Sequence, residues 1–477
     1  MSAPAGRSEQ LKPLQLLREL RNTRTSSFAE RLIKYDIISR TGSLLTRGFG
    51  RAVKPLLRFE GLLSYQQRLG IELIAAPSMT ANVLWALSPS AWAVRKYLMN
   101  VLVKPEKRTR PLVWLEWCLQ TDLIYAFDAQ PFCTESLSVL LLFLRPDAVS
   151  EMIDTAEQAG SPAEYCSGAK NAVGGYLARQ LPEPDCIVTS SHPCDSMVSS
   201  YQTLEYLSGA PCYRLDTPYW EDERALDYYT DQVRELIAFL EKHLDRRLDY
   251  DRLRQVLGEV NRTNELLMEI NEMLRARPCP GAVAPTIITW AVRVLGMGTP
   301  EVTEMARRLH GITRARLQAG RGPIKKERIR VIWFDVPVAF YPLVLWMEET
   351  FGAVTVMDLI SFIDTPAVDT STPESMIRGL AIANMNLCMP RQFHGPVELF
   401  HRDLERVCEQ YDGDCFIYAG HAGCKHGWAS VRLLKEYMKK IGMPLLVLST
   451  DIFDRRVTHE DQLKEQIEQF LASNGLI

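Results

Sequence analysis

The sequence predicts an α/β protein with two doubly wound, Rossmann-like lobes, a helical insert between them and an N-terminal helical arm. In two separate stretches of the chain, short apolar runs typical of strands alternate with helical segments, the pattern of parallel sheets covered by helices. Between these stretches lies a long segment with helical periodicity and no strand-like run. A chain of 477 residues is also too long for a single hydrophobic core.

The first lobe is predicted over residues 105–220, where a strand–helix–strand unit is the clearest signal. The runs CIVTS at 186–190 and PCYRLD at 211–216 are apolar enough for buried parallel strands. The segment between them has helical spacing and ends in a glycine.

Residues 1–104 precede this lobe. Their first part is richer in Arg and Lys than in Asp and Glu, and we expect a helical arm there rather than a transit peptide.

The helical insert is predicted over residues 221–327, because two long amphipathic segments follow each other there without a strand-like run. The second lobe is predicted over residues 328–477. It alternates helical segments with strand-like runs and closes with a helix. The strand-like runs lie at 329–338, 353–360, 414–420 and 443–450.

The composition excludes several classes of protein. A net charge of -3 gives no sign of the basic surface that nucleic-acid binding requires. No apolar run approaches the roughly 18 residues needed to span a bilayer, and the N-terminus lacks the apolar core of a secretion signal. We therefore expect a cytoplasmic protein.

The 11 cysteines are an odd number in a large chain without secretory features, so a disulfide framework is a poor explanation.

Three cysteines stand in positions suited to a shared site. Cys194 and Cys424 each open a turn shortly after a predicted strand, and Cys166 precedes a Gly-rich helical stretch. Ligands of open α/β sheets bind beyond the carboxyl ends of the strands, so two facing lobes would bring these thiols to one cleft. Three thiolates suit zinc or an iron–sulfur cluster. Their wide spacing in the sequence favours a cluster over zinc, but the pattern alone leaves buried thiols without metal as an open alternative.

Five motifs together resemble the 2-hydroxyacyl-CoA dehydratase family, which also contains the class I benzoyl-CoA reductases. The resemblance covers roughly residues 115–475 and depends on the order and spacing of the motifs. They are PFCTESL with Glu135, EYCSGAK with Cys166, the Cys194–Asp195 pair followed by GAPCYRLDTPYW, GHAGCKHGW with Cys424, and the C-terminal run with Asp451, Asp454 and Arg456. We expect the last three residues to form a structural ion pair.

The resemblance implies that Cys166, Cys194 and Cys424 hold a [4Fe-4S] cluster with one open iron position. It implies a heterodimer with a homologous second dehydratase subunit, and an ATP-dependent iron–sulfur activator protein that supplies one electron. The implied reaction is a lyase reaction of anaerobic metabolism. In it an (R)-2-hydroxyacyl-CoA loses water through a ketyl radical, because the β-hydrogen of an ordinary acyl-CoA is too weakly acidic for general-base catalysis alone.

Five further residues are candidates for the site: Glu135, and His192, His421, Lys425 and His426, which flank the cysteines. Hydrogen-bond donors beside cluster ligands would raise the cluster potential or orient substrate. Glu135 is a candidate base or substrate contact, with a turn-capping role as the alternative. His192 and His426 flank cluster cysteines and are candidate proton donors, or simply line the site. Lys425 follows Cys424 and would stabilise thiolate charge or bind a CoA phosphate, unless it is a surface lysine.

Two other functions remain open at this point. One lies within the same family: a reductase subunit that acts on an aromatic acyl-CoA, or on a small molecule through a double-cubane cluster. The other is a non-catalytic subunit that carries a relay cluster or supports its partner. The sequence does not name the acyl group of the substrate.

Overall fold

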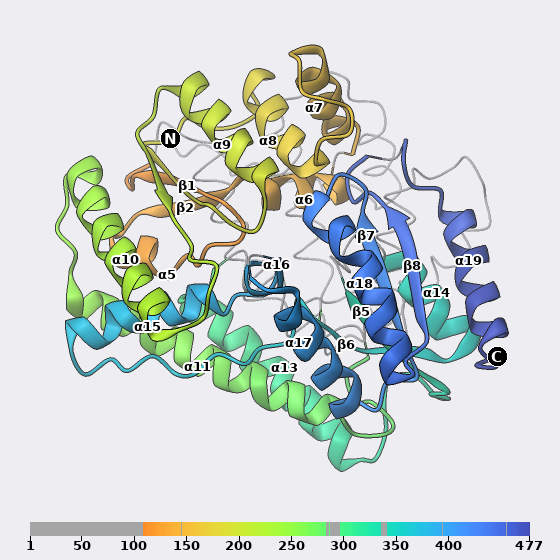
Figure 1. The fold of residues 1–477 in the computed structure, drawn as a ribbon. Coiled ribbons are helices and arrows are strands. Elements are labelled where there is room, and N and C mark those ends of the chain that lie inside the picture. The colour runs from red at the N-terminus through yellow and green to blue at the C-terminus, as the bar shows by residue number, and fades with distance from the viewer. Residues whose placement is uncertain are drawn as a thin grey trace, which may run out of the picture.

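A computed structural model describes residues 108–144, 146–282, 286, 296–334, 341–393, 395–454 and 456–477. The predicted helical arm, residues 1–104, lies outside the described residues. Within them, helices flank two separate four-stranded parallel sheets (Figure 1). The predicted α/β fold with two Rossmann-like lobes is therefore confirmed, whereas the exact boundaries between arm, lobes and insert stay predictions.

The first sheet has the strand order β2-β1-β3-β4. Its strands are β1 (Leu112–Leu115), β2 (Gln130–Cys133), β3 (Cys186–Ser190) and β4 (Cys212–Leu215). The last two are the strands expected from the sequence, whereas β1 and β2 were not predicted individually. The helices of this lobe are α5 (Asp122–Ala126), α6 (Thr134–Leu144), α7 (Pro146–Gln158), α8 (Ser167–Leu177) and α9 (Asp195–Ser208).

Side chains on the two faces of the first sheet enter different cores, as the alternation of a strand requires. Trp114 and Ile187 belong to the core that includes residues of α7, α8 and α9. Val113 and Val188, one residue along each strand, belong to the core that includes α10 (Glu223–Leu244) and α15 (Pro373–Met385). The sheet is thus covered by helices on both faces, which leaves its strand ends as the accessible edge.

The second sheet has the order β6-β5-β7-β8. Its strands, β5 (Ile329–Phe334), β6 (Ala353–Asp358), β7 (Cys415–His421) and β8 (Leu445–Thr450), fall close to the four runs expected from the sequence. The helices of this lobe, besides α15, are α14 (Tyr341–Phe351), α16 (Pro390–Phe393), α17 (Val397–Gln410), α18 (Lys425–Ile441) and α19 (Glu460–Ser473).

The insert contains the long helices α10, α11 (Tyr250–Leu274) and α13 (Pro300–Gln318), which lie along the lower and left sides of the molecule in Figure 1. Aspartate side chains cap two of them: Asp222 accepts from the backbone N–H of Ala225, and Asp249 caps α11. The fully buried Arg330 of β5 donates to the carbonyls of Leu274 and Ala276. These bonds satisfy the open C-terminal end of α11 and join the insert to the second sheet.

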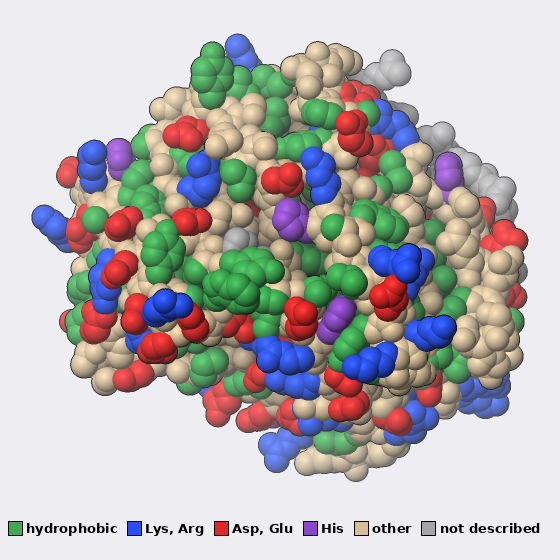
Figure 2. All heavy atoms as spheres, viewed as in Figure 1, with side chains coloured by type: hydrophobic (Ala, Val, Ile, Leu, Met, Phe, Trp, Pro, Cys, Tyr) green, Lys and Arg blue, Asp and Glu red, His purple; other side chains and the backbone are tan. Residues whose placement is uncertain are grey.

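On the face drawn in Figure 2, acidic and basic side chains are interspersed, most densely over its lower and left parts. Among the described residues, no helix combines the length and the apolar character needed to cross a bilayer.

Candidate functional site

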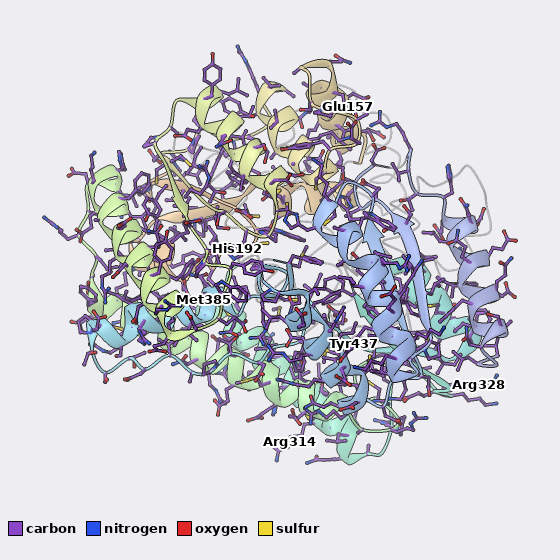
Figure 3. All side chains as sticks on the ribbon, viewed as in Figure 1. Glu157, His192, Arg314, Arg328, Met385 and Tyr437 are labelled. Atoms are coloured by element: carbon purple, nitrogen blue, oxygen red, sulfur yellow. The ribbon has the colours of Figure 1, made fainter. Side chains whose placement is uncertain are left out.

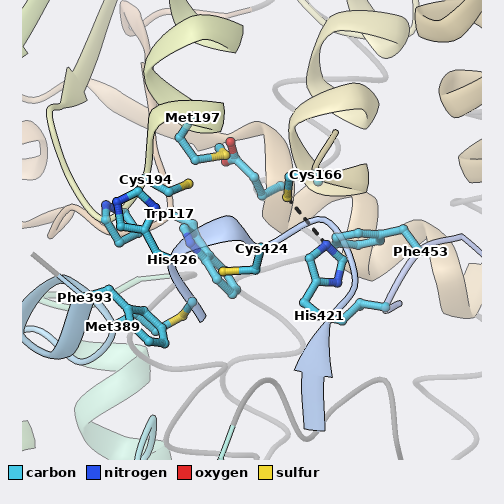
Figure 4. Close-up of a pocket in the computed structure, with 14 residues that line it drawn as sticks. Trp117, Cys166, Cys194, Met197, Met389, Phe393, His421, Cys424, His426 and Phe453 are labelled. Atoms are coloured by element: carbon cyan, nitrogen blue, oxygen red, sulfur yellow. Dashed lines mark hydrogen bonds between the residues drawn. The ribbon is translucent and has the colours of Figure 1, made fainter. Parts of the chain in front are cut away.

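One cavity of about 70 Å³ collects the three predicted cysteines. Cys166 and Cys194 reach it from the first lobe and Cys424 from the second, so the cavity lies between the lobes (Figure 4). The rest of its lining is mainly apolar. The lining includes Trp117, Glu135, Met197, Met389, Phe393, His421, His426 and Phe453.

Each of the three cysteines is the N-cap residue of a helix. Cys166 precedes α8, Cys194 precedes α9 and Cys424 precedes α18. The Cys424 sulfur accepts a hydrogen bond from the backbone N–H of Gly427 at 3.4 Å. Helix N-termini carry partial positive charge and free N–H groups, so they favour thiolate over thiol. The local fold therefore places three sulfurs at the N-terminal ends of helices.

The lobes touch through their backbones beside the cavity. A Cβ atom on Gly423 would lie 2.8 Å from the backbone nitrogen of Cys166 and 2.8 Å from the carbonyl oxygen of Tyr165. Only a residue without a side chain permits this approach. Gly423 thus holds the Cys424 turn of the second lobe directly against the Cys166 turn of the first.

The spacing of the donors does not suit a single metal ion. No three His, Cys, Asp or Glu side chains of the described part of the chain are grouped closely enough to bind one ion. Thiolates on one tetrahedral zinc are held roughly 3.8 Å apart by Zn–S bonds of roughly 2.3 Å. In a four-iron cluster each cysteine binds a different iron, so the sulfurs are farther apart. Three thiols that line one cavity without forming a single-ion group fit a cluster better than they fit zinc.

The three thiols influence one another electrostatically. Burial raises the pKa of the Cys194 thiol well above its usual value, and the neighbouring Cys166 and Cys424 raise it further. A thiolate at this place therefore needs a positive partner. The positive charge of a bound metal group would provide such a partner.

Glu135 lies in the cavity wall at the start of α6 and is only 4% exposed. Its Oε2 atom accepts hydrogen bonds from Cys133 Sγ at 3.2 Å and from Tyr201 Oη at 3.2 Å. Its Oε1 atom has no hydrogen-bond partner among the described residues. Burial raises the pKa of Glu135 to about 7. The structure thus places a carboxyl group that can take or release a proton near neutral pH beside the three cysteines.

Glu116 is a second buried carboxyl that the sequence did not reveal. It follows β1 directly and is fully buried, and its Oε2 atom accepts hydrogen bonds from Thr189 Oγ1 and from the backbone N–H of Ser190, both at 2.9 Å. Burial raises the pKa of Glu116 to about 8, and the charge of Glu135 adds to this shift. The register of the first sheet explains why Glu116 and Glu135 are near each other. Leu115 of β1 pairs with Cys133 of β2, and the two glutamates follow shortly after these residues.

His421 and His426 line the cavity, but the other two basic candidates do not. His192 is buried, and its Nδ1 atom lies 2.7 Å from Thr217 Oγ1 (Figure 3 shows its place in the molecule). Lys425 is 60% exposed, with its Nζ atom 3.8 Å from Asp195 Oδ2. The cavity therefore brings together Cys166, Cys194, Cys424, Glu135, His421 and His426, and leaves His192 and Lys425 outside its lining.

The C-terminal motif forms the expected ion pair only in part. Arg456 pairs with Asp454 at 2.6 Å and with Glu157 of α7 at 2.7 Å. Asp451 does not join them. Its Oδ1 atom accepts from Ser167 Oγ at 2.6 Å, immediately after Cys166. The motif therefore attaches the second lobe to the first at two places, and one of them adjoins the cavity.

The sequence matches the model of a protein family described as "2-hydroxyglutaryl-CoA dehydratase, D-component" over residues 117–473. The chain belongs to this family. The matched range contains all the residues that form the cavity, so the resemblance expected from the motifs is confirmed.

Three relatives of this chain carry names that state a function. A benzoyl-CoA reductase subunit of Thauera aromatica is 24% identical over 67% of this chain and 78% of its own length. The alpha subunit of lactoyl-CoA dehydratase of Anaerotignum propionicum is 28% identical over 67% of this chain and 80% of its own length. The (R)-2-hydroxyisocaproyl-CoA dehydratase alpha subunit of Clostridioides difficile is 21% identical over 49% of this chain and 60% of its own length.

These relatives support an enzyme subunit of the dehydratase or reductase type. All three are named as subunits, which implies a partner subunit for this chain as well. Identities of 21–28% do not distinguish between the two reactions.

Proposed function

We propose that this chain is a subunit of a 2-hydroxyacyl-CoA dehydratase, in which Cys166, Cys194 and Cys424 bind a [4Fe-4S] cluster that leaves one iron open to substrate. The observation that carries this proposal is the meeting of three N-cap cysteines from both lobes with the buried carboxyl of Glu135 on one cavity. When bound, such a cluster supplies the one-electron chemistry that makes a β-hydrogen of an acyl-CoA acidic.

Glu135 is the group best placed to take that proton. Its pKa of about 7 means that a large fraction is ionised at neutral pH, while its basicity stays higher than that of an ordinary carboxylate. Cys133 and Tyr201 hold one carboxyl oxygen, and the other oxygen has no hydrogen-bond partner in the described part of the chain. The apolar wall of Trp117, Phe393 and neighbouring side chains would exclude water from the reacting atoms.

The remaining candidates take supporting roles. His426 lines the cavity and would donate a proton to the leaving hydroxyl. His192 stands outside the lining and would position the turn before Cys194 through its contact with Thr217. Lys425, exposed at the start of α18, would bind a phosphate of CoA. A homologous second subunit and an ATP-dependent iron–sulfur activator complete the proposed system.

A reductase acting on an aromatic acyl-CoA is the second candidate. Two observations favour it: one relative is named as a subunit of benzoyl-CoA reductase, and Trp117, Phe393 and Phe453 supply aromatic surface to the cavity. Flat aromatic groups pack well against such side chains.

Product analysis of the anaerobic complex with its partner and activator separates these functions. The proposal predicts a 2-enoyl-CoA from an (R)-2-hydroxyacyl-CoA and no product from benzoyl-CoA. A cyclic diene product from benzoyl-CoA would establish the reductase instead. If the complex turned over while its cysteine variants in this chain remained fully active, the chain would be a supporting subunit.

A further inference from the structure

His421 connects the second lobe to the Cys166 turn of the first lobe. It is the last residue of β7 and is 7% exposed. Its Nε2 atom lies 3.5 Å from Cys166 Sγ and 3.3 Å from Ser167 Oγ. Figure 4 shows the imidazole ring beside the Cys166 sulfur, with Phe453 next to it.

The hydrogen bonds of Ser167 favour His421 as the donor at this contact. Ser167 has a single O–H group, and it donates this group to Asp451 Oδ1 at 2.6 Å. The same oxygen of Asp451 accepts the backbone N–H groups of Phe453 and Asp454, which fix the carboxylate in place. Since the Ser167 hydroxyl is already used, it can only accept from His421. The 3.3 Å contact with Ser167 is therefore a hydrogen bond only when the Nε2 atom of His421 carries a hydrogen, and that hydrogen then also faces the Cys166 sulfur.

We propose that His421 is a positioning residue whose Nε2–H group donates to the Cys166 thiolate and raises the reduction potential of the cluster. This inference rests on the proposed ligand set. A hydrogen bond to a ligand sulfur withdraws electron density and so stabilises the reduced, more negative state. Ser167 and Asp451 act through His421, because they determine the direction of its N–H group.

The hydrogen bond from His421 to Cys166 would also make the reduction potential of the cluster depend on the contact between the two lobes. Cys166 and Ser167 belong to the first lobe, whereas His421 and Asp451 belong to the second. Separation of the lobes would remove the donor from the sulfur. The reduction potential of the cluster would therefore be highest when the two lobes are in contact.

The test is an anaerobic redox titration of the holoprotein, monitored by the EPR signal of the reduced cluster, with iron content measured in parallel. His421→Phe removes the donor, and we expect full iron with a more negative midpoint potential. His421→Gln keeps an N–H group near the place of Nε2 and should restore most of the potential. Ser167→Ala frees His421 to turn toward Asp451 Oδ2, now 3.8 Å away, and should lower the potential less.

His401→Phe is the matched control, because His401 is 8% exposed, much like His421, but stacks on Tyr437 instead of lining the cavity. It should leave the potential at the wild-type value. A wild-type midpoint in His421→Phe with full iron, or an equal shift in both phenylalanine variants, would overturn the inference. If His421→Phe lost its iron, an unchanged midpoint in Ser167→Ala would overturn it. A wild-type protein without iron would refute the ligand set and this inference together.

Discussion

A Cβ atom on Gly423 would lie 2.6 Å from the Cα atom of Cys166, so glycine alone allows the two lobes to meet at this point. The two residues are far apart in the sequence and come from different lobes. Their contact fixes the distance between the cysteine of one lobe and the Cys424 turn of the other.

Gly423→Ala should therefore separate the lobes at the cavity. The added methyl group meets backbone atoms that cannot rotate away, and we expect the free energy of unfolding to fall by about 1–3 kcal/mol together with a loss of bound iron. Gly311→Ala is the control, because a Cβ atom there meets open space within α13 and should stabilise by up to about 1 kcal/mol. Full iron content in Gly423→Ala would show that the contact is dispensable.

Glu116→Gln should change how stability depends on pH. Burial raises the pKa of Glu116 from an ordinary 4.5 to about 8, so the folded state holds a proton that the unfolded state releases. Its contribution is complete below about pH 4.5 and is lost as the pH rises to about 8. The loss is at most about 1.4 kcal/mol per pH unit. Urea unfolding at pH 5, 6, 7 and 8 should give a flatter profile for the variant, and identical slopes would contradict the assignment.

Glu135→Gln should abolish most of the turnover without removing the cluster. Loss of a general base lowers rates by about 10²–10⁴-fold, and an amide keeps the size of the side chain. The wild-type rate should rise with pH through about 7, as the Glu135 carboxyl ionises. Glu116→Gln removes a carboxyl that does not line the cavity, so its turnover should fall far less. Equal losses in the two variants would remove Glu135 from the role of base.

Lys425→Ala should weaken binding of CoA thioesters with little effect on the fold. Both members of the Lys425–Asp195 pair are about 60% exposed, and such pairs contribute roughly 0–1 kcal/mol. We expect a higher KM for an acyl-CoA but an unchanged KM for the corresponding acyl-pantetheine, which lacks the nucleotide phosphates. Lys435→Ala, on the exposed side of the same helix, is the control. An equal change for both thioesters would exclude a phosphate contact.

The sequence predicted the strands that are long or strongly apolar, such as β3, β5 and β7. It did not reveal β1 and β2. The sequence of β2, QPFC, contains Gln and Pro, which are uncommon in strands. The sequence of β1, LVWL, is as short as that of β4 but fully apolar, so neither its length nor its composition explains why it was missed. The insert was predicted as a separate helical region. The structure shows that α10 shares a core with the first sheet and with α15 of the second lobe.

The meeting of Cys194 and Cys424 could be predicted because a general rule places ligands at the carboxyl ends of parallel strands, whereas Cys166 lies between α7 and α8 and follows no strand. Gly423, Ser167 and Glu116 could not be predicted in the same way. Their roles come from contacts between lobes or between neighbouring strands, and no local pattern encodes which residues will face each other there. His192 shows the converse: it adjoins the Cys194 turn in the sequence, yet its ring contacts Thr217 and lies outside the cavity lining.

Iron and acid-labile sulfide analysis of the anaerobically purified protein tests the central claim most directly. The account predicts a brown protein with a broad absorbance near 400 nm. Cys166→Ser, Cys194→Ser and Cys424→Ser should each lose most of the iron, while Cys212→Ser, a strand thiol outside the cavity lining, should keep it. A colourless wild-type protein, or three cavity variants that retain all of their iron, would contradict the account.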